Sequence, residues 1–502
     1  MTSGNGARER LSQRTLTGLP VRVRRPAYDR SKIPIGIVHI GPGAFHRAHQ
    51  AVYVDDILAE DPRWGISAVS LKNRATRDAL APQDGLYALS ILDDHPSLRV
   101  IGSIRELLVA PEGPRHVLDR LAHPGVRVVT ITVTEKGYEL DGAGNLDLAS
   151  PAVRADLAAP RAPQSLAGFL VEGLRLRREA GMPALTIISC DNLPDNGERL
   201  RRAVVAFARE HDRGLAAWID AETRFPRTMV DSITPATDDA LRVRVSDALG
   251  LWDAWPVQRE AFHQWVIEDT LVPGGPDWAG VGATLTRDVG AHERAKLRLL
   301  NGAHSTLAYI GLLRGHATVF DAVMDQSLAD FVGDLLTKDV VPALAASPGI
   351  DLDSYIQAIF RRFRNRAIRH NLAQIAWDGS QKIPIRILAT LNDAVRAGRP
   401  IGRLCVPVAA WMQFVRRAAL EGRAIIDPMA EQLIAIGTRC TGKAKIDVPM
   451  FLALEPMFGE LARVPAFTQG VEVAYTILGG GTPAERSFEM PLPQALYGTP
   501  DA

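Results

Sequence analysis

The stretch IGIVHIGPGAFHRAHQ at residues 35–50 joins a short apolar run to a glycine-containing turn and then to a helical pattern. The run from Ile35 to Ile40 is rich in β-branched residues, which predicts a short buried strand. Gly41 and Gly43 predict a tight turn, and residues 48–58 have the pattern of a helix. A strand, a glycine turn and a helix in this order predict the first unit of a parallel sheet.

Similar strand patterns recur through the first half of the chain, at residues 66–71, 127–133 and 184–190. An amphipathic helix is predicted at residues 166–180, between the last two of these strands. Strands that alternate with helices are typical of an open parallel sheet that binds a dinucleotide. The fold class predicted for this part is therefore an α/β Rossmann-type domain.

The character of the sequence changes after about residue 285, where helical patterns replace strand patterns. Helices are predicted at residues 291–313, 328–344, 385–397, 406–420 and 429–436. We therefore expect an irregular N-terminal arm at residues 1–32, a Rossmann-type domain at 33–286, and a mainly α-helical domain for substrate and catalysis at 287–502.

The glycine turn is the predicted binding site for the pyrophosphate of a dinucleotide. Gly41 and Gly43 let the backbone approach a phosphate, and Ala44 and Phe45 open the following helix, whose N-terminus carries N–H donors. His46 stands where the usual fingerprint has a third glycine. The spacing is equally compatible with a structural turn, and the location in the first βαβ unit favours the binding site.

The end of the second predicted strand bears on the choice of coenzyme. A carboxylate at this position usually binds the ribose of NAD, but this chain has Lys72 and Arg74 there. The two cations either contact the 2′-phosphate of NADP or are ordinary solvated charges, so the expected cofactor is NAD, with NADP possible. Thr134 and Glu135 follow the third strand and are predicted to line the same edge of the sheet.

A lysine on the first predicted helix of the second domain is the main catalytic candidate. At 3.6 residues per turn, Lys296 and His304 lie about 80° apart on one side of this helix, with Asn301 between them. Lys296 lies along the apolar face, where desolvation should lower its pKa and suit it to act as a general base. The alternative is a buried lysine whose ammonium reaches the rim of the core. Three polar groups on one apolar stripe favour the catalytic interpretation, because each costs free energy to bury.

Composition excludes several classes of partner and of site. The 58 basic and 57 acidic residues give a net charge of +1, which offers no electrostatic reason to bind nucleic acid or an anionic membrane. The polar N-terminus predicts no secretory signal, and three scattered cysteines predict a reducing compartment, so we expect a cytoplasmic protein. No cysteine lies in a zinc-type cluster, and no metal is expected.

Seven segments, spread in order over most of the chain from about residue 33, resemble the mannitol dehydrogenase family of polyol-specific long-chain dehydrogenases. They are GPGAFHRAHQ (41–50), TVTEKGY (132–138), SCDNLPDNG (189–197), FPRTMVDSITP (225–235), QWVIED (264–269), KLRLLNGAHS (296–305) and DGSQKIP (378–384).

The resemblance implies a metal-independent enzyme, in many cases monomeric, with an active site between its two domains. It implies that Lys296 is the base, that Asn192 and Asn301 hold the reacting oxygen, and that Glu293 relays the proton. Other residues are implied to contact substrate: His304, Lys382 and, at a position where mannitol 2-dehydrogenases have an arginine, Gln374. Asp231, a polar residue among apolar ones, is a further candidate substrate contact.

The predicted substrate is a small polyol or sugar acid, and the type reaction is the oxidation of D-mannitol to D-fructose. Gln374 and the sequences TEKGY and DGSQKIP are shared with fructuronate reductases. A fructuronate reductase is therefore the alternative enzyme. A nucleotide-binding sensor without turnover is the alternative of another class. It is disfavoured because such a protein would have no reason to bury Lys296, Asn301 and His304 together.

Overall fold

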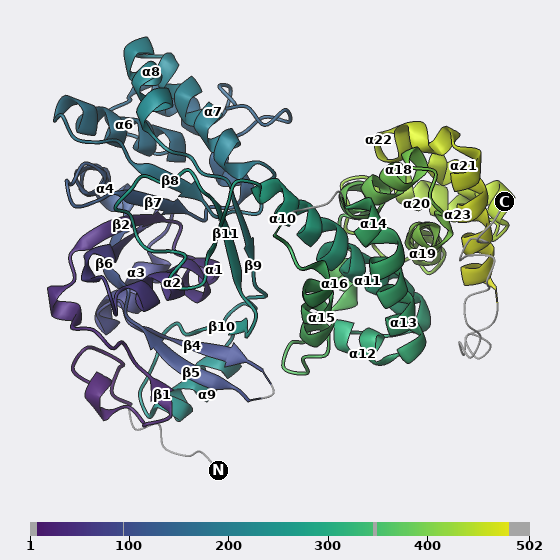
Figure 1. Cartoon of the computed structure of the whole chain (residues 1–502), viewed down its shortest axis with the longest axis horizontal. Helices are drawn as coiled ribbons and strands as arrows, with labels where there is room; N and C mark the ends of the chain where they lie inside the picture. The colour runs from purple at the N-terminus through teal and green to yellow at the C-terminus, as the bar shows by residue number, and fades with distance from the viewer. Residues whose placement is uncertain (1–7, 94, 345–348, 481–502) are drawn as a thin grey trace. The chain divides into compact units, whose positions relative to one another are not determined.

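The computed structural model describes residues 8–93, 95–344 and 349–480. The chain divides into two compact units, Met1–Gly290 and Ala291–Ala502, which are described separately below (Figure 1). Unit 1 is built on a five-stranded parallel sheet with the order β6-β3-β2-β7-β8. These strands are β2 (Ile35–Ile40), β3 (Gly65–Ser70), β6 (Ile104–Val109), β7 (Val128–Ile131) and β8 (Thr186–Ser189).

Both faces of this sheet are covered by helices, which explains the unbroken apolar sequence of its strands. Val38 and Ile40 of β2 face the core beneath α4 (Pro114–Leu121), α6 (Leu166–Glu179) and α7 (Asn196–Arg209). Ile37 faces the opposite core beneath α1 (Ala44–Ala48) and α2 (Gln50–Ile57). The predicted Rossmann-type fold is confirmed.

The helix predicted at residues 48–58 is wrong in its extent. Helical structure begins at Ala44 and is interrupted at His49, where the backbone adopts φ −125° and ψ −88°. His49 Nε2 lies 3.0 Å from the carbonyl oxygen of Gln264 in β11 (Gln264–Glu268), a tertiary contact that local sequence does not reveal.

Two smaller sheets of unit 1 were not predicted. One has the order β1-β5-β4-β10 and the other β12-β11-β9. The strands not yet introduced are β1 (Val23–Arg24), β4 (Tyr87–Leu92), β5 (Ser97–Ile101), β9 (Thr228–Asp231), β10 (Val257–Glu260) and β12 (Thr284–Thr286). The segment expected as an irregular arm contributes β1, which pairs with β5, and the buried side chains of Leu11, Leu16 and Leu19.

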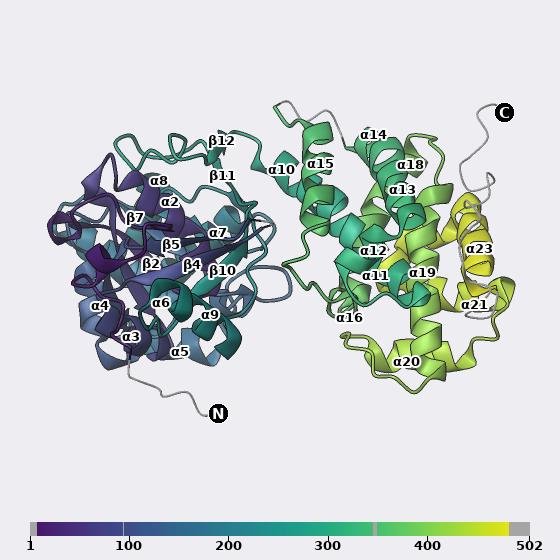
Figure 2. The ribbon, with the colours of Figure 1, turned by 90° about the horizontal axis from the view of Figure 1, so that it is seen from below.

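Unit 2 is helical, as predicted. Its longest helix, α19 (Gly402–Leu420), lies between α11 (Gly302–Arg314) and α23 (Pro465–Gly479) in both views (Figures 1 and 2). The remaining helices are α10 (Val289–Ala295, which begins in unit 1), α12 (Val319–Met324), α13 (Gln326–Asp334), α14 (Val341–Ala343), α15 (Leu352–Phe363), α16 (Leu372–Ile375), α17 (Gly379–Ile383), α18 (Ala389–Arg396), α20 (Ala430–Arg439), α21 (Ala444–Leu452) and α22 (Glu455–Phe458).

The helix predicted at residues 291–313 is not a regular α-helix. A π-helical turn, Lys296–Asn301, lies between α10 and α11. Hydrogen bonds in a π turn span five residues rather than four, so the 80° separation worked out for Lys296 and His304 does not hold across it. Such turns inside α-helices occur frequently at functional sites.

Candidate functional site

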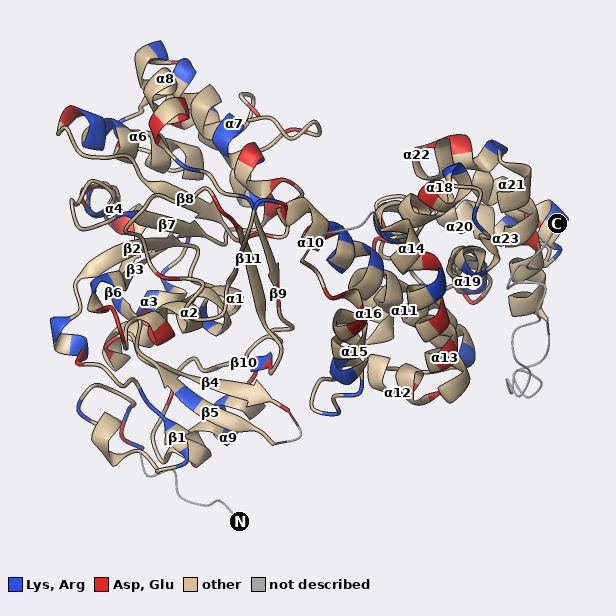
Figure 3. Cartoon of the chain, viewed as in Figure 1, with Lys and Arg blue, Asp and Glu red and all other residues tan. Residues whose placement is uncertain are grey.

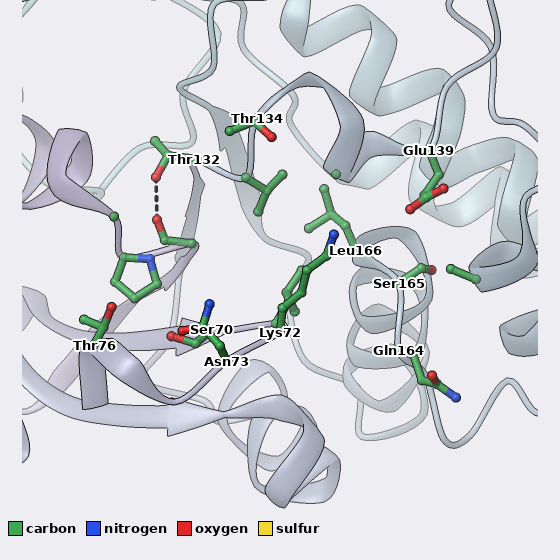
Figure 4. A pocket seen from close by; sticks show the side chains of 17 residues that line it. Ser70, Lys72, Asn73, Thr76, Thr132, Thr134, Glu139, Gln164, Ser165 and Leu166 are labelled. Carbon is green, nitrogen blue, oxygen red and sulfur yellow. Dashed lines mark hydrogen bonds between the residues drawn. The ribbon is translucent and has the colours of Figure 1, made fainter. Parts of the chain in front are cut away.

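A crevice of about 410 Å³ lies at the carboxyl edge of the five-stranded sheet in unit 1. It is lined by the turn after β2, the loops after β3 and β7, and the start of α6 (Figure 4). The strand that follows β2 in sequence, β3, is its neighbour on one side, and β7 is its neighbour on the other. The crevice therefore lies at a topological switch point, the place where open α/β sheets bind their ligands.

Gly41 is required by the backbone at the floor of this crevice. Its φ is +94°, and a Cβ atom at this position would lie 2.2 Å from the carbonyl oxygen of Thr132. A Cβ at Gly43 would meet only the carbonyl oxygen of Gly41, at 3.9 Å, and Gly43 is exposed. Gly41 is thus fixed by packing, whereas Gly43 leaves open space above the turn, as the approach of a phosphate requires.

A buried histidine supports the glycine turn from below. The Oγ1 atom of Thr132 donates a hydrogen bond to the carbonyl oxygen of Gly41 (2.7 Å) and lies 3.0 Å from Nε2 of His39. Because the Thr132 proton goes to Gly41, His39 Nε2 carries the donor hydrogen, and Nδ1 accepts from Thr130 Oγ1 at 2.8 Å. Burial lowers the pKa of His39 to about 3, so the ring is neutral.

Thr134, a predicted cofactor residue, lines the crevice in a strained conformation. Its φ of 69° and ψ of 164° lie in a region that β-branched residues almost never adopt. The Asp191 carboxylate accepts hydrogen bonds from the N–H groups of Val133 (2.9 Å) and Thr134 (3.1 Å) and from the Tyr138 hydroxyl (2.7 Å). Burial raises the pKa of Asp191, and these donors oppose the shift. Asp191, at the end of β8, thereby holds the strained loop in place.

The two cations predicted for the coenzyme's ribose differ in their surroundings. Lys72 lines the crevice, where its side chain reaches inward (Figure 4), and it forms no ion pair with any described residue. The guanidinium of Arg74 lies 2.8 Å from the Asp78 carboxylate and does not line the crevice. Of these two cations, only Lys72 lines the crevice.

The other predicted cofactor residues surround the glycine turn without lining the crevice. Ala44 and Phe45 begin α1, and the Phe45 ring stacks on His49 at 4.9 Å. Glu135 is exposed at the start of a short 3-10 turn. Sequence reasoning missed several residues that do line it, among them Ser70, Asn73, Thr76, Thr132, Glu139, Gln164 and Ser165. The serine–helix boundary at Ser165, an N-cap of α6, was the available sequence signal for one of them.

The predicted catalytic lysine lies in unit 2, on the π turn. Lys296 is buried, with 8% of its surface exposed, among Ala295, Leu299 and Leu300 of the hydrophobic core. Glu293 precedes it on α10, and Asn301 ends the π turn, both half-buried. The structure thus places an amine, an amide and a carboxylate along one short helical segment.

His304 follows on α11, where its neighbours are aromatic or basic side chains. Its Nε2 atom is buried and has no hydrogen-bond partner, and its ring lies 4.6 Å from Phe363 and 5.0 Å from His370 between centroids. Burial, and then the neighbouring His370, Arg362 and Arg386, hold the pKa of His304 well below its ordinary value. The ring is therefore a neutral donor or acceptor for a ligand.

The DGSQKIP segment forms α17 and carries Lys382, whose amine donates to the carbonyl oxygen of Ile375 at 3.5 Å. Asp378 adopts a left-handed conformation with φ 54°, and Ser380 donates to the carboxylate of Asp427 through its N–H (2.8 Å) and its hydroxyl (2.5 Å). The Lys382 amine lies 3.8 Å from the Asp378 carboxylate, and burial lowers its pKa. Gln374, on α16, is exposed.

Two predicted substrate residues, Asn192 and Asp231, belong to unit 1. Asn192 is exposed just beyond β8, and Asp231 is buried at the end of β9. The following residues of the DNLPDNG segment are structural: Asn196 Nδ2 donates to the carbonyl oxygens of Asp191 (3.1 Å) and Thr228 (3.0 Å). The segment therefore combines a structural turn with the exposed Asn192.

Within residues 8–93, 95–344 and 349–480, no three His, Cys, Asp or Glu side chains are arranged to hold a metal ion. In the same ranges, no helix combines the length and the apolar character needed to cross a bilayer.

The parallel sheet, its glycine turn and the crevice at the switch point define a protein of the dinucleotide-binding class with a second, helical domain. The Mannitol dehydrogenase Rossmann domain matches residues 35–280, and the Mannitol dehydrogenase C-terminal domain matches residues 288–478. The chain belongs to the mannitol dehydrogenase family.

Similar proteins include enzymes named for different substrates. The D-mannonate oxidoreductase of Escherichia coli (strain K12) is 39% identical over 92% of this chain and 96% of its own. The polyol:NADP oxidoreductase of Gluconobacter oxydans (strain 621H) is 39% identical over 81% of this chain and 85% of its own. The Pseudomonas fluorescens mannitol 2-dehydrogenase, solved with NAD and D-mannitol, is 39% identical with a TM-score of 0.78, over 93% of this chain and 96% of that structure.

Proposed function

We propose that this protein interconverts a secondary alcohol and a ketone on a linear, sugar-derived substrate, with a nicotinamide coenzyme as the hydride carrier. The observation that carries the proposal is the match of both domains to one dehydrogenase family, joined with a buried lysine on a π turn. The type reaction is D-mannitol to D-fructose. Reduction of D-fructuronate to D-mannonate is the second candidate, favoured by Gln374, which stands where mannitol 2-dehydrogenases have an arginine.

Lys296 is the proposed general base. In the oxidation direction, its neutral amine takes the hydroxyl proton while the carbon-bound hydrogen leaves as hydride, so an alcohol becomes a ketone and the amine becomes an ammonium. The coenzyme, when bound, supplies the acceptor for this hydride. Asn301 and Asn192 are proposed to donate hydrogen bonds to the substrate oxygen, whose negative charge grows during the reaction. Glu293 is proposed to pass the proton onward, and no metal takes part.

The crevice in unit 1 is the proposed coenzyme site, with NAD(H) as the expected coenzyme. A turn that excludes a Cβ at Gly41 and leaves space above Gly43 fits a pyrophosphate. NADP(H) is the second candidate because Lys72 lines the crevice without an acidic partner among the described residues. Reduction rates with NADH and NADPH on one substrate panel decide between them.

The test of the base role is Lys296→Ala in the full chain. A general base contributes about 10²- to 10⁴-fold, so we expect turnover to fall by that factor while NADH binding, followed by its fluorescence, stays unchanged. Lys338→Ala is the matched control, because Lys338 also lies on a π turn of unit 2 but is exposed and pairs with Asp334 at 2.8 Å. Comparable turnover of the Lys296 variant and wild type would refute the proposed base. Unchanged activity after chelator treatment is expected from a metal-free mechanism.

A further inference from the structure

Arg386 is a half-buried cation of unit 2 that forms no ion pair with any described residue. It lies on a π turn, Pro384–Leu388, and its side chain is half-buried. Its Nη1 donates to Ser305 Oγ at 3.1 Å, while Nε is buried without a partner. No carboxylate of the described residues lies within 4.0 Å of its guanidinium. Placing an unpaired charge in such a position costs free energy unless a ligand supplies the opposite charge.

The groups around Arg386 are cationic or neutral donors. The neutral rings of His304 and His370 lie 5.0 Å apart, and each has a buried nitrogen without a partner, Nε2 and Nδ1 respectively. The charges of Arg362 and Arg386 add to the effect of burial in lowering the pKa of His304. Arg386 also adds to the effect of burial on the pKa of Lys382. We name these five residues the Arg386 cluster.

The acidic residues near this cluster balance only one side of it. The charges of Asp378 and Asp427 raise the pKa of Lys382, with Asp378 at 3.8 Å. Neither carboxylate affects the pKa of His304, on which the neighbouring charges are all positive. The side of the cluster formed by Arg386 and His304 therefore carries an uncompensated positive field.

The same charge extends onto the surface of unit 2. The segment RRFRNRAIRH at residues 361–370 contains five arginines and His370, and it closes α15 and forms the loop after it. Arg361, Arg364, Arg366 and Arg369 are exposed, and the end of α15 appears blue in Figure 3. A surface of one sign beside an interior cation of the same sign attracts anions and raises their local concentration.

The Arg386 cluster adjoins the proposed reacting residues within unit 2. His304 and Ser305 lie on α11, directly after the π turn that carries Lys296 and Asn301. A Cβ at Gly302 would lie 3.2 Å from the carbonyl oxygen of Arg386, so the start of α11 packs against the backbone of the π turn that carries Arg386. The Arg386 guanidinium, through its contact with Ser305, therefore lies beside the helix that continues from Lys296 and Asn301.

We propose that Arg386 binds a carboxylate of the substrate, with His304 and His370 as neutral donors beside it, and that the enzyme acts on a linear sugar acid. The inference rests on the proposed function and narrows its substrate class. A guanidinium pairs with a carboxylate through two parallel hydrogen bonds. A neutral polyol has no carboxylate and cannot form this charged pair. A neutral substrate would leave the charge of Arg386 uncompensated when it excludes water from the cluster.

The experiment compares D-fructuronate with D-fructose as substrates of the full chain, with NADH and with NADPH. We expect wild type to have at least a 10-fold higher kcat/KM for D-fructuronate. Arg386→Gln should lower that value about 10- to 100-fold, mainly through KM, as expected for the loss of a charged hydrogen bond. The same variant should change kcat/KM for D-fructose by less than threefold, and Arg386→Lys should restore part of the loss.

Arg364→Gln is the matched control, because Arg364 belongs to the same basic segment but is exposed, with its guanidinium 5.7 Å from the Phe360 ring. This variant removes one positive charge without changing the Arg386 cluster. It should change kcat/KM for either substrate by less than threefold. Calorimetry of D-mannonate and D-mannitol binding to the Lys296→Ala protein with reduced coenzyme gives the same comparison without turnover. In the double variant Lys296→Ala/Arg386→Gln, affinity should fall for D-mannonate and stay the same for D-mannitol.

Two results would overturn the carboxylate site while leaving the proposed function intact. One is a wild-type preference for D-fructose, and the other is an equal loss for both substrates in Arg386→Gln. By contrast, a chain that binds NADH or NADPH but reduces no ketose and no ketouronate would overturn the proposed function itself.

Discussion

Replacing Thr134 by glycine should stabilise unit 1, because Thr134 holds a backbone conformation that only glycine adopts readily. Its φ of 69° and ψ of 164° correspond to a strain of about 1–3 kcal/mol. A glycine removes this strain but makes the unfolded chain more flexible, at a cost of about 0.4–1 kcal/mol. We therefore expect Thr134→Gly to raise the free energy of unfolding by about 1 kcal/mol relative to Thr134→Ala. The alanine variant also lacks the hydroxyl but keeps the Cβ and the strain.

Urea unfolding followed by tryptophan emission measures this difference, since Trp64, Trp265 and Trp278 are all buried in unit 1. We also expect Thr134→Gly to bind NADH severalfold more weakly, because the loop that lines the crevice is no longer held in one conformation. Equal stability of the glycine and alanine variants would refute the argument from strain. Tighter coenzyme binding by the glycine variant would refute the argument from preorganisation.

Three further predictions concern the same unit. Gly41→Ala should abolish coenzyme binding and destabilise unit 1, because the added Cβ would meet the Thr132 carbonyl oxygen at 2.2 Å; fluorescence titration and urea unfolding check this. Lys72→Ser should lower kcat/KM with NADPH about tenfold or more and leave NADH unaffected, whereas Arg74→Ser, whose charge is already paired, should change neither. Equal effects of the two variants would exclude Lys72 as the contact to the 2′-phosphate. The low pKa of His39, about 3, means that below pH 6.5 the unfolded chain takes up a proton that the folded chain does not. Stability should therefore fall as the pH drops, by about 2 kcal/mol between pH 6.5 and 5 from His39 alone. In His39→Asn, the free energy of unfolding measured in urea should therefore depend less on pH between pH 6.5 and 5.

The strands of the parallel sheet were predictable because they are buried on both faces and carry a continuous apolar pattern. The segments at residues 35–40 and 66–71 correspond to β2 and β3 within one residue. Strands β4, β5 and β10 were not predicted. The sequences of β5 and β10 mix polar and apolar residues, and β10 pairs with β4, far along the chain. Val257, for instance, pairs with Leu89.

In the candidate site, too, some features were predictable from the sequence and others depend on the fold. The chemistry of Lys296, Asn301 and His304 was apparent from their types and order. The π turn Lys296–Asn301, which contacts the turn Pro384–Leu388, was not predicted. Lys72 and Arg74 were indistinguishable in sequence, and only the ion pair of Arg74 with Asp78 separates them. Arg386 had no sequence signal, because its character depends on the absence of a carboxylate near it.

The sequence by itself determined the order of strands and helices, the glycine turn and the residue types at the reacting centre, since periodicity and local steric limits depend on neighbours along the chain. Tertiary structure decided which charges are paired, which backbone is strained and where a helix changes its hydrogen bonding. These properties depend on groups distant in sequence, such as Asp191 beside Thr134 and Ser305 beside Arg386. Burial and electrostatics act through space, so only the folded chain fixes them.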